Sequence, residues 1–217
     1  VNVSANKALA WSFSRLTDFE KCPAMAHAKF VAKRPEPAGM ERKHADRGLA
    51  VHKEAEDYVQ GKTDTLPDSL KKFADLVNWY KELYATGIVE VEQDWAYDLD
   101  WQPTGWFDDN CWARIKLDLF IKHPDLPWEV VDYKTGRSPG EGWEAKALFQ
   151  MRFYGLILWR LHGQVPARLQ LLYLGNQERL AIDPTEAELR ATEAKLEALW
   201  AAIDRATASG DWQPNRS

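Results

Sequence analysis

The sequence predicts an α/β fold in which a mixed central sheet is flanked by helices and preceded by a helical N-terminal part. Two observations favour it. Apolar residues recur at helical spacing up to residue 87, whereas strand-like and helical segments alternate after it. The 217 residues, of which 45% are hydrophobic, can bury a sizeable core. We therefore expect a single domain over residues 1–217, with residues 1–87 helical and residues 88–217 forming the sheet-containing core.

Three helices are expected in the N-terminal part. They cover residues 12–30, 47–59 and 67–87. Ser12 or Ser14 can cap the first helix, because a serine hydroxyl accepts a hydrogen bond from a free backbone N–H of the first turn. In the third helix the apolar residues form one broad stripe, and Gly87 suits its C-terminal end. Basic residues are concentrated between the first two helices.

Five strands and two helices are expected after residue 87. The strands cover residues 88–99, 111–121, 128–134, 167–175 and 177–182. A helix over residues 142–163 is apolar on most sides, so we expect it to pack on the sheet. Asp183 and Pro184 supply an N-cap and a first-turn proline for a last helix that ends near Ser209.

Composition limits the functional classes. The net charge of −5 excludes a globally basic nucleic-acid binder but allows a local basic groove. No apolar stretch reaches the length of about 18 residues that a spanning helix needs, and no basic-then-apolar leader is present. Cys22 and Cys111 are the only cysteines, which is no disulfide framework. We therefore expect a cytoplasmic protein with no membrane partner.

An acid and a lysine stand two residues apart at the end of an apolar strand, in the segment WEVVDYKTGRSPG. Alternate side chains of a strand share a face, so Asp132 and Lys134 point the same way. On the preceding strand, Asp118 lies opposite the apolar row. If these two strands pair, Asp118 and Asp132 approach each other with Lys134 beside them.

Two neighbouring carboxylates repel each other when both are charged, and a divalent cation removes that repulsion. Carboxylate oxygens are ligands that Mg²⁺ and Mn²⁺ favour, and a nearby lysine can hold a water and steady charge on a phosphate. This combination suits phosphodiester hydrolysis by metal-activated water. The alternative is a solvated surface pair of an acid and a lysine at a strand end, with Asp118 as an ordinary polar residue. These residues alone do not decide between a metal-dependent site and such a surface pair.

Further motifs occur in one order along the chain: CP after SFSRLTDFEK, RGLAVH, KLD, DYKTG and QMRFY. Together they resemble the PD-(D/E)XK nuclease superfamily, and within it the RecB-type exonuclease branch that includes small exonucleases of CRISPR adaptation and of phages. The resemblance extends from about Ser12 to the last helix. It implies a restriction-endonuclease-like core and a metal-dependent DNA nuclease, with exonuclease action on single strands or DNA ends.

The resemblance also implies roles for individual residues. His52, Asp118 and Asp132 match metal ligands, the carbonyl of Tyr133 adds another, and Lys134 matches the catalytic lysine that acts with the two aspartates. Neutral imidazole favours Mn²⁺ over Mg²⁺, and either ion is expected as the cofactor. Without the resemblance, His52 would be a helix-surface histidine.

Nucleic-acid contacts are implied for part of the helix after the DYKTG segment. The residues are Gln150, Tyr154, Arg152 and Lys146. Gln150 and Tyr154 are four apart and share a helix face, where they either touch the nucleic-acid backbone or orient the lysine. The alternative is a chance glutamine beside a core tyrosine. Glu90 or Glu92 could add an acid on the first strand, but neither is assigned.

Cys22-Pro23 matches the first ligand of an iron–sulfur cluster found in many relatives, whereas Cys111 stands at the wrong position for another. Four cysteines hold such a cluster, so a cluster is not expected in this chain. Several tryptophans near the second strand either stack on single-stranded bases or pack in the core. They are Trp95, Trp101, Trp106 and Trp112.

The favoured interpretation is a nuclease acting on DNA in bacterial or phage-infected cytoplasm, with partners in recombination, repair or CRISPR adaptation. One rival is a nucleic-acid-binding subunit of a recombination or repair complex that does not cleave. Asp118, Asp132 and Lys134 together argue against it, because binding alone does not need all three. The other rival is a protein-interaction module built on the long terminal helices.

Overall fold

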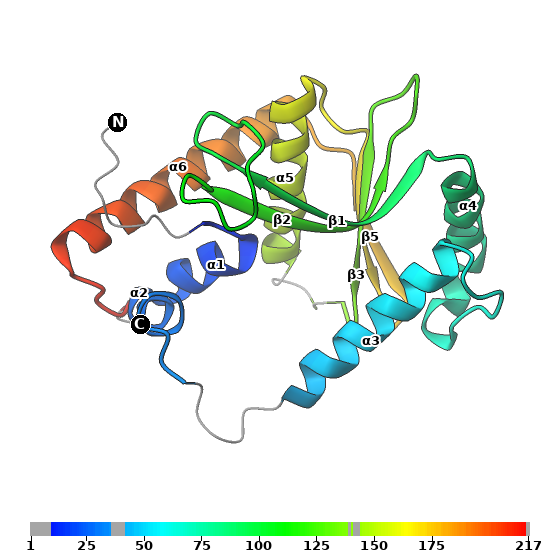
Figure 1. Cartoon of the computed structure of the whole chain (residues 1–217), viewed down its shortest axis with the longest axis horizontal. Coiled ribbons are helices and arrows are strands. Elements are labelled where there is room, and N and C mark those ends of the chain that lie inside the picture. Colours follow the sequence, from blue (N-terminus) through cyan, green and yellow to red (C-terminus); the bar gives the residue numbers. More distant parts are fainter. Residues whose placement is uncertain (1–9, 36–41, 139, 141–143, 216–217) are drawn as a thin grey trace. The chain divides into compact units, whose positions relative to one another are not determined.

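The computed structural model describes residues 10–35, 42–138, 140 and 144–215 (Figure 1). The chain forms two compact units. We call residues 1–40, 94–115 and 190–217 the terminal unit, and residues 41–93 and 116–189 the central unit. Every residue that the sequence predicts for the site belongs to the central unit, which is therefore described first.

The sheet has five strands in the order β1-β2-β3-β4-β5. The strands are β1 (Val89–Tyr97), β2 (Ala113–Ile121), β3 (Glu129–Lys134), β4 (Arg168–Tyr173) and β5 (Glu178–Ile182). β2 pairs with β3 and β4 with β5 in antiparallel fashion, whereas β3 and β4 are parallel. The helix α5 (Glu144–His162) makes the crossover that a parallel pair requires. The predicted mixed sheet is confirmed.

Two helices, α3 (Arg42–Val59) and α4 (Ala74–Ala85), cover one face of the sheet in the central unit (Figure 1). Alternate strand residues point into this layer, among them Leu119 and Val131, and both are fully buried. From α3 come Ala55, Tyr58 and Val59, whose spacing of three and four places them on one helix face. Each fully buried aliphatic side chain contributes about 1.5–3 kcal/mol.

The helix α5 covers the opposite face (Figure 1). Its residues 151–158 are buried apart from the half-buried Arg152, as the sequence predicts for a helix that packs on the sheet. Gly155 allows close packing, because a Cβ atom there would lie 2.9 Å from Leu169 Cδ1 on β4 and 3.2 Å from Leu189 Cδ2.

The prediction of one continuous helix over residues 12–30 is wrong, because the segment forms three shorter helices. It begins as predicted with Ser12, whose hydroxyl accepts a hydrogen bond from the Arg15 backbone N–H at 3.4 Å. However, α1 (Phe13–Lys21) ends before Cys22. The short helix α2 (Pro23–Ala26) and the π-helix η1 (His27–Val31) follow it. Cys22 adopts φ −161° and ψ 104° because the ring of Pro23 disfavours helical geometry at the preceding residue.

The third predicted helix is composite. A 3₁₀ segment, η2 (Asp68–Phe73), precedes α4. Its end is as predicted, because Gly87 has φ +78° and donates to the Tyr84 carbonyl while Ile88 donates to the Leu83 carbonyl, both at 3.0 Å. These two bonds satisfy the last carbonyls of the helix.

The last helix, α6 (Glu186–Ser209), has a different cap from the one predicted. The Glu188 backbone N–H donates to the Thr185 hydroxyl at 3.3 Å, and the Thr185 N–H donates to the Glu188 carboxylate at 3.0 Å. This reciprocal pair makes Thr185 the cap. The predicted cap, Asp183, instead accepts two hydrogen bonds from Arg168, at 2.7 and 3.0 Å.

In the terminal unit, tryptophans pack against one another. Trp112 makes edge-on contacts with Trp101 and with Trp200 of α6, at centroid distances of 5.3 and 5.8 Å. Trp106 packs beside the buried Cys111. Trp101, Trp106 and Trp112 are half-buried, and these contacts pack them against other side chains of the unit. Both cysteines are free thiols, and no helix among the described residues is long and apolar enough to cross a membrane.

We expect Gly175→Ala to destabilise the protein by about 1–3 kcal/mol, because overpacking against backbone cannot be relieved by a rotamer change. The added Cβ would lie 2.7 Å from the Gly136 carbonyl oxygen and 3.0 Å from that of Thr135, in the turn after β3. Urea unfolding measures the change. Gly136→Ala is the matched control, since a Cβ there meets nothing within 4 Å. Equal stability of the two variants would contradict the packing argument.

Candidate active site

Asp118 on β2 is fixed by the neighbouring strand. In the antiparallel register Leu119 lies opposite Val131. Asp118, one residue before Leu119, and Asp132, one residue after Val131, are therefore neighbours on the two strands. The Tyr133 backbone N–H donates to Asp118 Oδ2 at 2.6 Å, and the Asp118 side chain is only 11% exposed. The carboxylate is therefore held by backbone rather than by a flexible partner.

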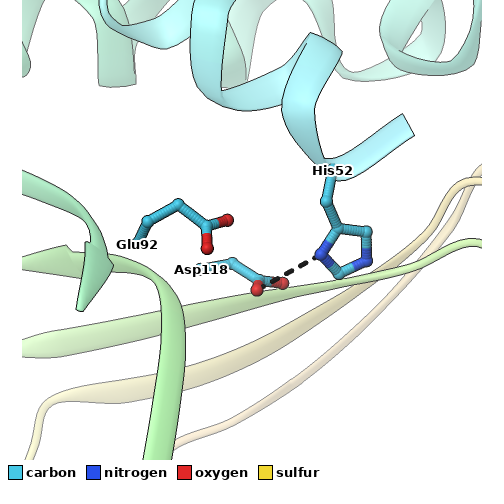
Figure 2. Close-up of side chains that lie close together, drawn as sticks. All are labelled: His52, Glu92 and Asp118. Atoms are coloured by element: carbon cyan, nitrogen blue, oxygen red, sulfur yellow. Dashed lines mark ion pairs between the residues drawn. The ribbon is translucent and has the colours of Figure 1, made fainter. Parts of the chain in front are cut away.

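His52 reaches Asp118 from α3 (Figure 2). It lies three residues before Ala55 and seven before Val59, at the edge of the face that packs on the sheet. Its Nδ1 is 3.3 Å from Asp118 Oδ1, and its ring meets the edge of Tyr133 at a centroid distance of 6.1 Å. The hydrogen bond to Asp118 raises the pKa of His52, and burial opposes that rise.

Asp132 connects the lysine to the helix on the opposite face. Lys134 Nζ lies 2.5 Å from Asp132 Oδ2. The Tyr154 hydroxyl on α5 donates to Asp132 Oδ1 at 3.4 Å, and Gln150 Nε2 donates to that hydroxyl at 2.8 Å. Four of the predicted residues are thus connected by one ion pair and two hydrogen bonds.

Burial governs the protonation of Asp132, which is 5% exposed. Burial raises the pKa of Asp132 to about 6, the Lys134 ammonium opposes the rise, and the Asp118 charge adds to it. Near neutral pH a buried negative charge therefore stands beside a second carboxylate. Such an arrangement is costly unless a positive charge offsets it.

Glu92 on β1 is a member of the site that sequence reasoning did not assign. One ligand atom from each of His52, Glu92 and Asp118 lies within 4.8 Å of the others (Figure 2). Burial and the Asp118 charge raise the pKa of Glu92. Strand alternation could not identify Glu92, because Glu90 lies two residues away and is predicted to share its face. Glu90 instead pairs with Lys122 at 3.0 Å.

These side chains fit a divalent cation. They offer one imidazole nitrogen and several carboxylate oxygens, which is a donor set suited to Mn²⁺ and, for the oxygens, to Mg²⁺. A cation among them would also offset the charge of Asp118, Glu92 and Asp132.

The two predicted basic contacts on α5 differ from each other. Arg152 Nη2 lies 2.5 Å from Glu188 Oε1 at the start of α6, so its guanidinium has an acidic partner. Lys146 is exposed on the first turns of α5. Arg152 is two residues from both Gln150 and Tyr154, and a separation of two on a helix points a side chain away from its neighbours.

Comparison with known proteins agrees with this geometry. A profile described as the PD-(D/E)XK nuclease superfamily matches residues 10–110 and 113–216. The chain belongs to this superfamily. Its membership makes the chain a nuclease with a nucleic-acid substrate, and the resemblance to this superfamily that the motifs indicate is confirmed. Comparison with curated protein sequences gave no match.

One solved structure shows the same fold. A predicted exonuclease from Eubacterium rectale superposes with a TM-score of 0.54 at 13% identity, covering 100% of this chain and 90% of its own. The structure of SSO0001 has a TM-score of 0.48 at 14% identity, with 91% of this chain and 79% of that chain covered. The superposition on the Eubacterium rectale structure confirms the restriction-endonuclease-like α/β fold.

We expect the stability of Asp132→Asn, relative to wild type in EDTA, to rise with pH. The folded-state pKa of about 6 is above the ordinary 3.8, so the stability contribution of the protonated acid is complete below pH 3.8 and is lost as the pH rises through 6. Asparagine carries no such proton. Between about pH 4.5 and about pH 7.5 the variant should gain about 2 kcal/mol on wild type in urea unfolding.

Asp183→Asn is the control for this measurement. Arg168 lowers the pKa of the exposed Asp183 below its ordinary 3.8, so the stability contribution of this acid is present above pH 3.8 and is lost only below it. Between about pH 4.5 and about pH 7.5 the stability difference between Asp183→Asn and wild type should therefore stay nearly constant. A stability difference between wild type and Asp132→Asn that stays constant with pH would contradict the burial argument.

Proposed function

We propose that this nuclease is a metal-dependent deoxyribonuclease that acts as an exonuclease on single strands or DNA ends, with Mg²⁺ or Mn²⁺ as cofactor. One observation carries the proposal: His52, Asp118, Asp132 and Lys134, from three elements, meet in one connected set of contacts at 2.5–3.3 Å around Asp118 and its neighbour on β3. These contacts connect a histidine, two buried acids and a lysine.

His52, Asp118 and Asp132 would hold the ion, and the Tyr133 carbonyl is proposed as an additional ligand. Bound there, the ion would lower the pKa of a water from about 15.7 toward about 7 and offset charge on the scissile phosphate. The Tyr133 N–H keeps Asp118 Oδ2 in one orientation, and the edge-on contact with Tyr133 limits rotation of the His52 ring. These contacts preorganise the ligands.

Lys134 would act at the attacking water and at the scissile phosphate. Its side chain is 31% exposed, so a substrate can reach the ammonium, while Asp132 holds the nitrogen at 2.5 Å. Hydrogen bonds from a fixed ammonium stabilise the negative charge that develops on a phosphate oxygen. Asp132 thereby has two tasks in the proposal, since it binds metal and positions the lysine.

The Gln150–Tyr154 pair would orient Asp132. The sequence left a choice between a nucleic-acid contact and an orienting role, and the hydroxyl of the buried Tyr154 contacts Asp132. Lys146 is proposed to contact phosphates, because it is exposed. Arg152 would contribute only its guanidinium N–H groups not engaged by Glu188.

The finer assignments rest on the resemblance to the RecB-type branch. They are DNA rather than RNA, ends rather than internal bonds, cytoplasmic location, and partners in recombination, repair or CRISPR adaptation. One relative in fold is named as a predicted exonuclease, and at 13% identity the likeness shows the fold alone.

We expect Lys134→Ala to lower cleavage by at least about 10²-fold, because a positioned proton-handling and charge-stabilising group is lost. The assay uses end-labelled linear single-stranded and duplex DNA beside circular DNA, with Mg²⁺ or Mn²⁺ and an EDTA control. Lys122→Ala is the matched lysine variant, since Lys122 pairs with Glu90 away from Asp132.

Loss of metal-dependent cleavage in Lys134→Ala alone would support the assigned role, and circles left intact would support an exonuclease. Cut circles would contradict the exonuclease assignment. A wild-type protein that binds DNA but never cuts it would favour the non-cleaving binding subunit.

A further inference from the structure

We propose that Glu92 is a ligand of the metal site, sharing an ion with His52 and Asp118. The inference rests on the proposed function, since it names an additional residue of that site. It departs from the motif residues, which assign the acids of the site to β2 and β3 and none to β1.

Spacing is the first argument. Two ligands of one ion at coordination distances of about 2.0–2.2 Å lie no more than about 4.4 Å apart. The three ligand atoms of His52, Glu92 and Asp118 lie within 4.8 Å of one another. Small side-chain rotations would therefore bring them onto one ion. Figure 2 shows the three groups directed toward a common point from α3, β1 and β2.

The engagement of the other carboxylates is the second argument. Asp132 Oδ2 is held by Lys134 at 2.5 Å, and its Oδ1 accepts from Tyr154 at 3.4 Å. Among the described residues, no hydrogen bond or ion pair engages the Glu92 carboxylate. Glu92 can thus join His52, Asp118 and Asp132 at the ion without giving up another contact.

The backbone supplies a third, supporting argument. Glu92 has φ +51° in the middle of a strand, a left-handed conformation that costs a residue with a Cβ atom about 1 kcal/mol or more. Glycine would adopt it without that cost. A glutamate at this position is therefore unfavourable for folding, and such residues concentrate at functional sites. Glu90, two residues earlier, does not have a left-handed backbone conformation.

The chemistry of the trio points to Mn²⁺-like ions. One imidazole nitrogen with two carboxylates suits a first-row divalent metal, whereas Ca²⁺ prefers oxygen ligands alone. Glu92 would raise the negative charge around the ion and tighten binding, whichever acids complete the coordination.

The test is Mn²⁺ binding to the full chain, followed by the electron paramagnetic resonance signal of free Mn²⁺ and by calorimetry. We expect Glu92→Gln to weaken Mn²⁺ binding by at least about tenfold, as loss of a coordination partner does. Glu90→Gln is the matched control on the same strand, and its Mn²⁺ affinity should equal that of wild type. Asp118→Asn should lose binding altogether.

Glu92→Gly separates a ligand from a structural residue. We expect this variant to have a higher melting temperature than wild type in EDTA, because glycine adopts the left-handed conformation without strain, and yet to bind Mn²⁺ as weakly as Glu92→Gln. A lower melting temperature with unchanged Mn²⁺ affinity would overturn the inference.

The two proposals can fail separately. If Asp118→Asn loses Mn²⁺ and Glu92→Gln retains wild-type affinity, the ligand role of Glu92 is overturned while the proposed metal site stands. If wild type binds no Mn²⁺, or Asp118→Asn binds as wild type does, the proposed metal site itself is overturned, and the role of Glu92 falls with it.

Discussion

The pairing of β2 with β3 is the constraint on which the site depends. It places Asp118 and Asp132 next to each other, and it turns the backbone N–H of Tyr133 onto the Asp118 carboxylate at 2.6 Å. Side chains alternate between the two faces of a sheet, so a slip of one residue between β2 and β3 would put the two aspartates on opposite faces. The apolar residues Leu119 and Val131 prevent that slip, because they are fully buried in the layer under α3 and α4.

The site draws on both helical layers. His52 comes from α3 on one face, and Tyr154 comes from α5 on the other. Each helix buries apolar residues against the sheet and carries a polar residue to the aspartates at the edge of its packed face. Stable packing therefore provides the precision that the ligands need, and unfavourable charge is concentrated at one place. Burial first, and the charge of Asp118 second, raise the pKa values of Asp132 and Glu92.

Much of this arrangement could be predicted from sequence, because it follows the two-residue alternation of a strand and the four-residue spacing of a helix. Alternation along β3 puts Asp132 and Lys134 on one face, and a spacing of four puts Gln150 and Tyr154 on one side of α5. The broken first helix was also foreseeable, since Pro23 restricts Cys22.

Other features depend on contacts or conformations that no local pattern specifies. Arg152 meets Glu188, which is 36 residues away, and Thr185 replaces Asp183 as the cap because Arg168 binds Asp183. Glu92 and Glu90 are two residues apart on one strand, so alternation does not distinguish them. Glu92 differs from Glu90 in having a left-handed backbone conformation. The fold could thus be predicted in outline and the aspartate–lysine pair in detail, whereas the third acid required the structure.

The most direct measurement is anomalous diffraction at the manganese edge from a crystal of this protein grown with Mn²⁺. The account predicts an anomalous peak in coordination contact with a carboxylate oxygen of Asp118 and with His52. A well-ordered crystal in which the peak lies elsewhere, or in which His52 and Asp118 keep their direct contact with no metal between them, would contradict it.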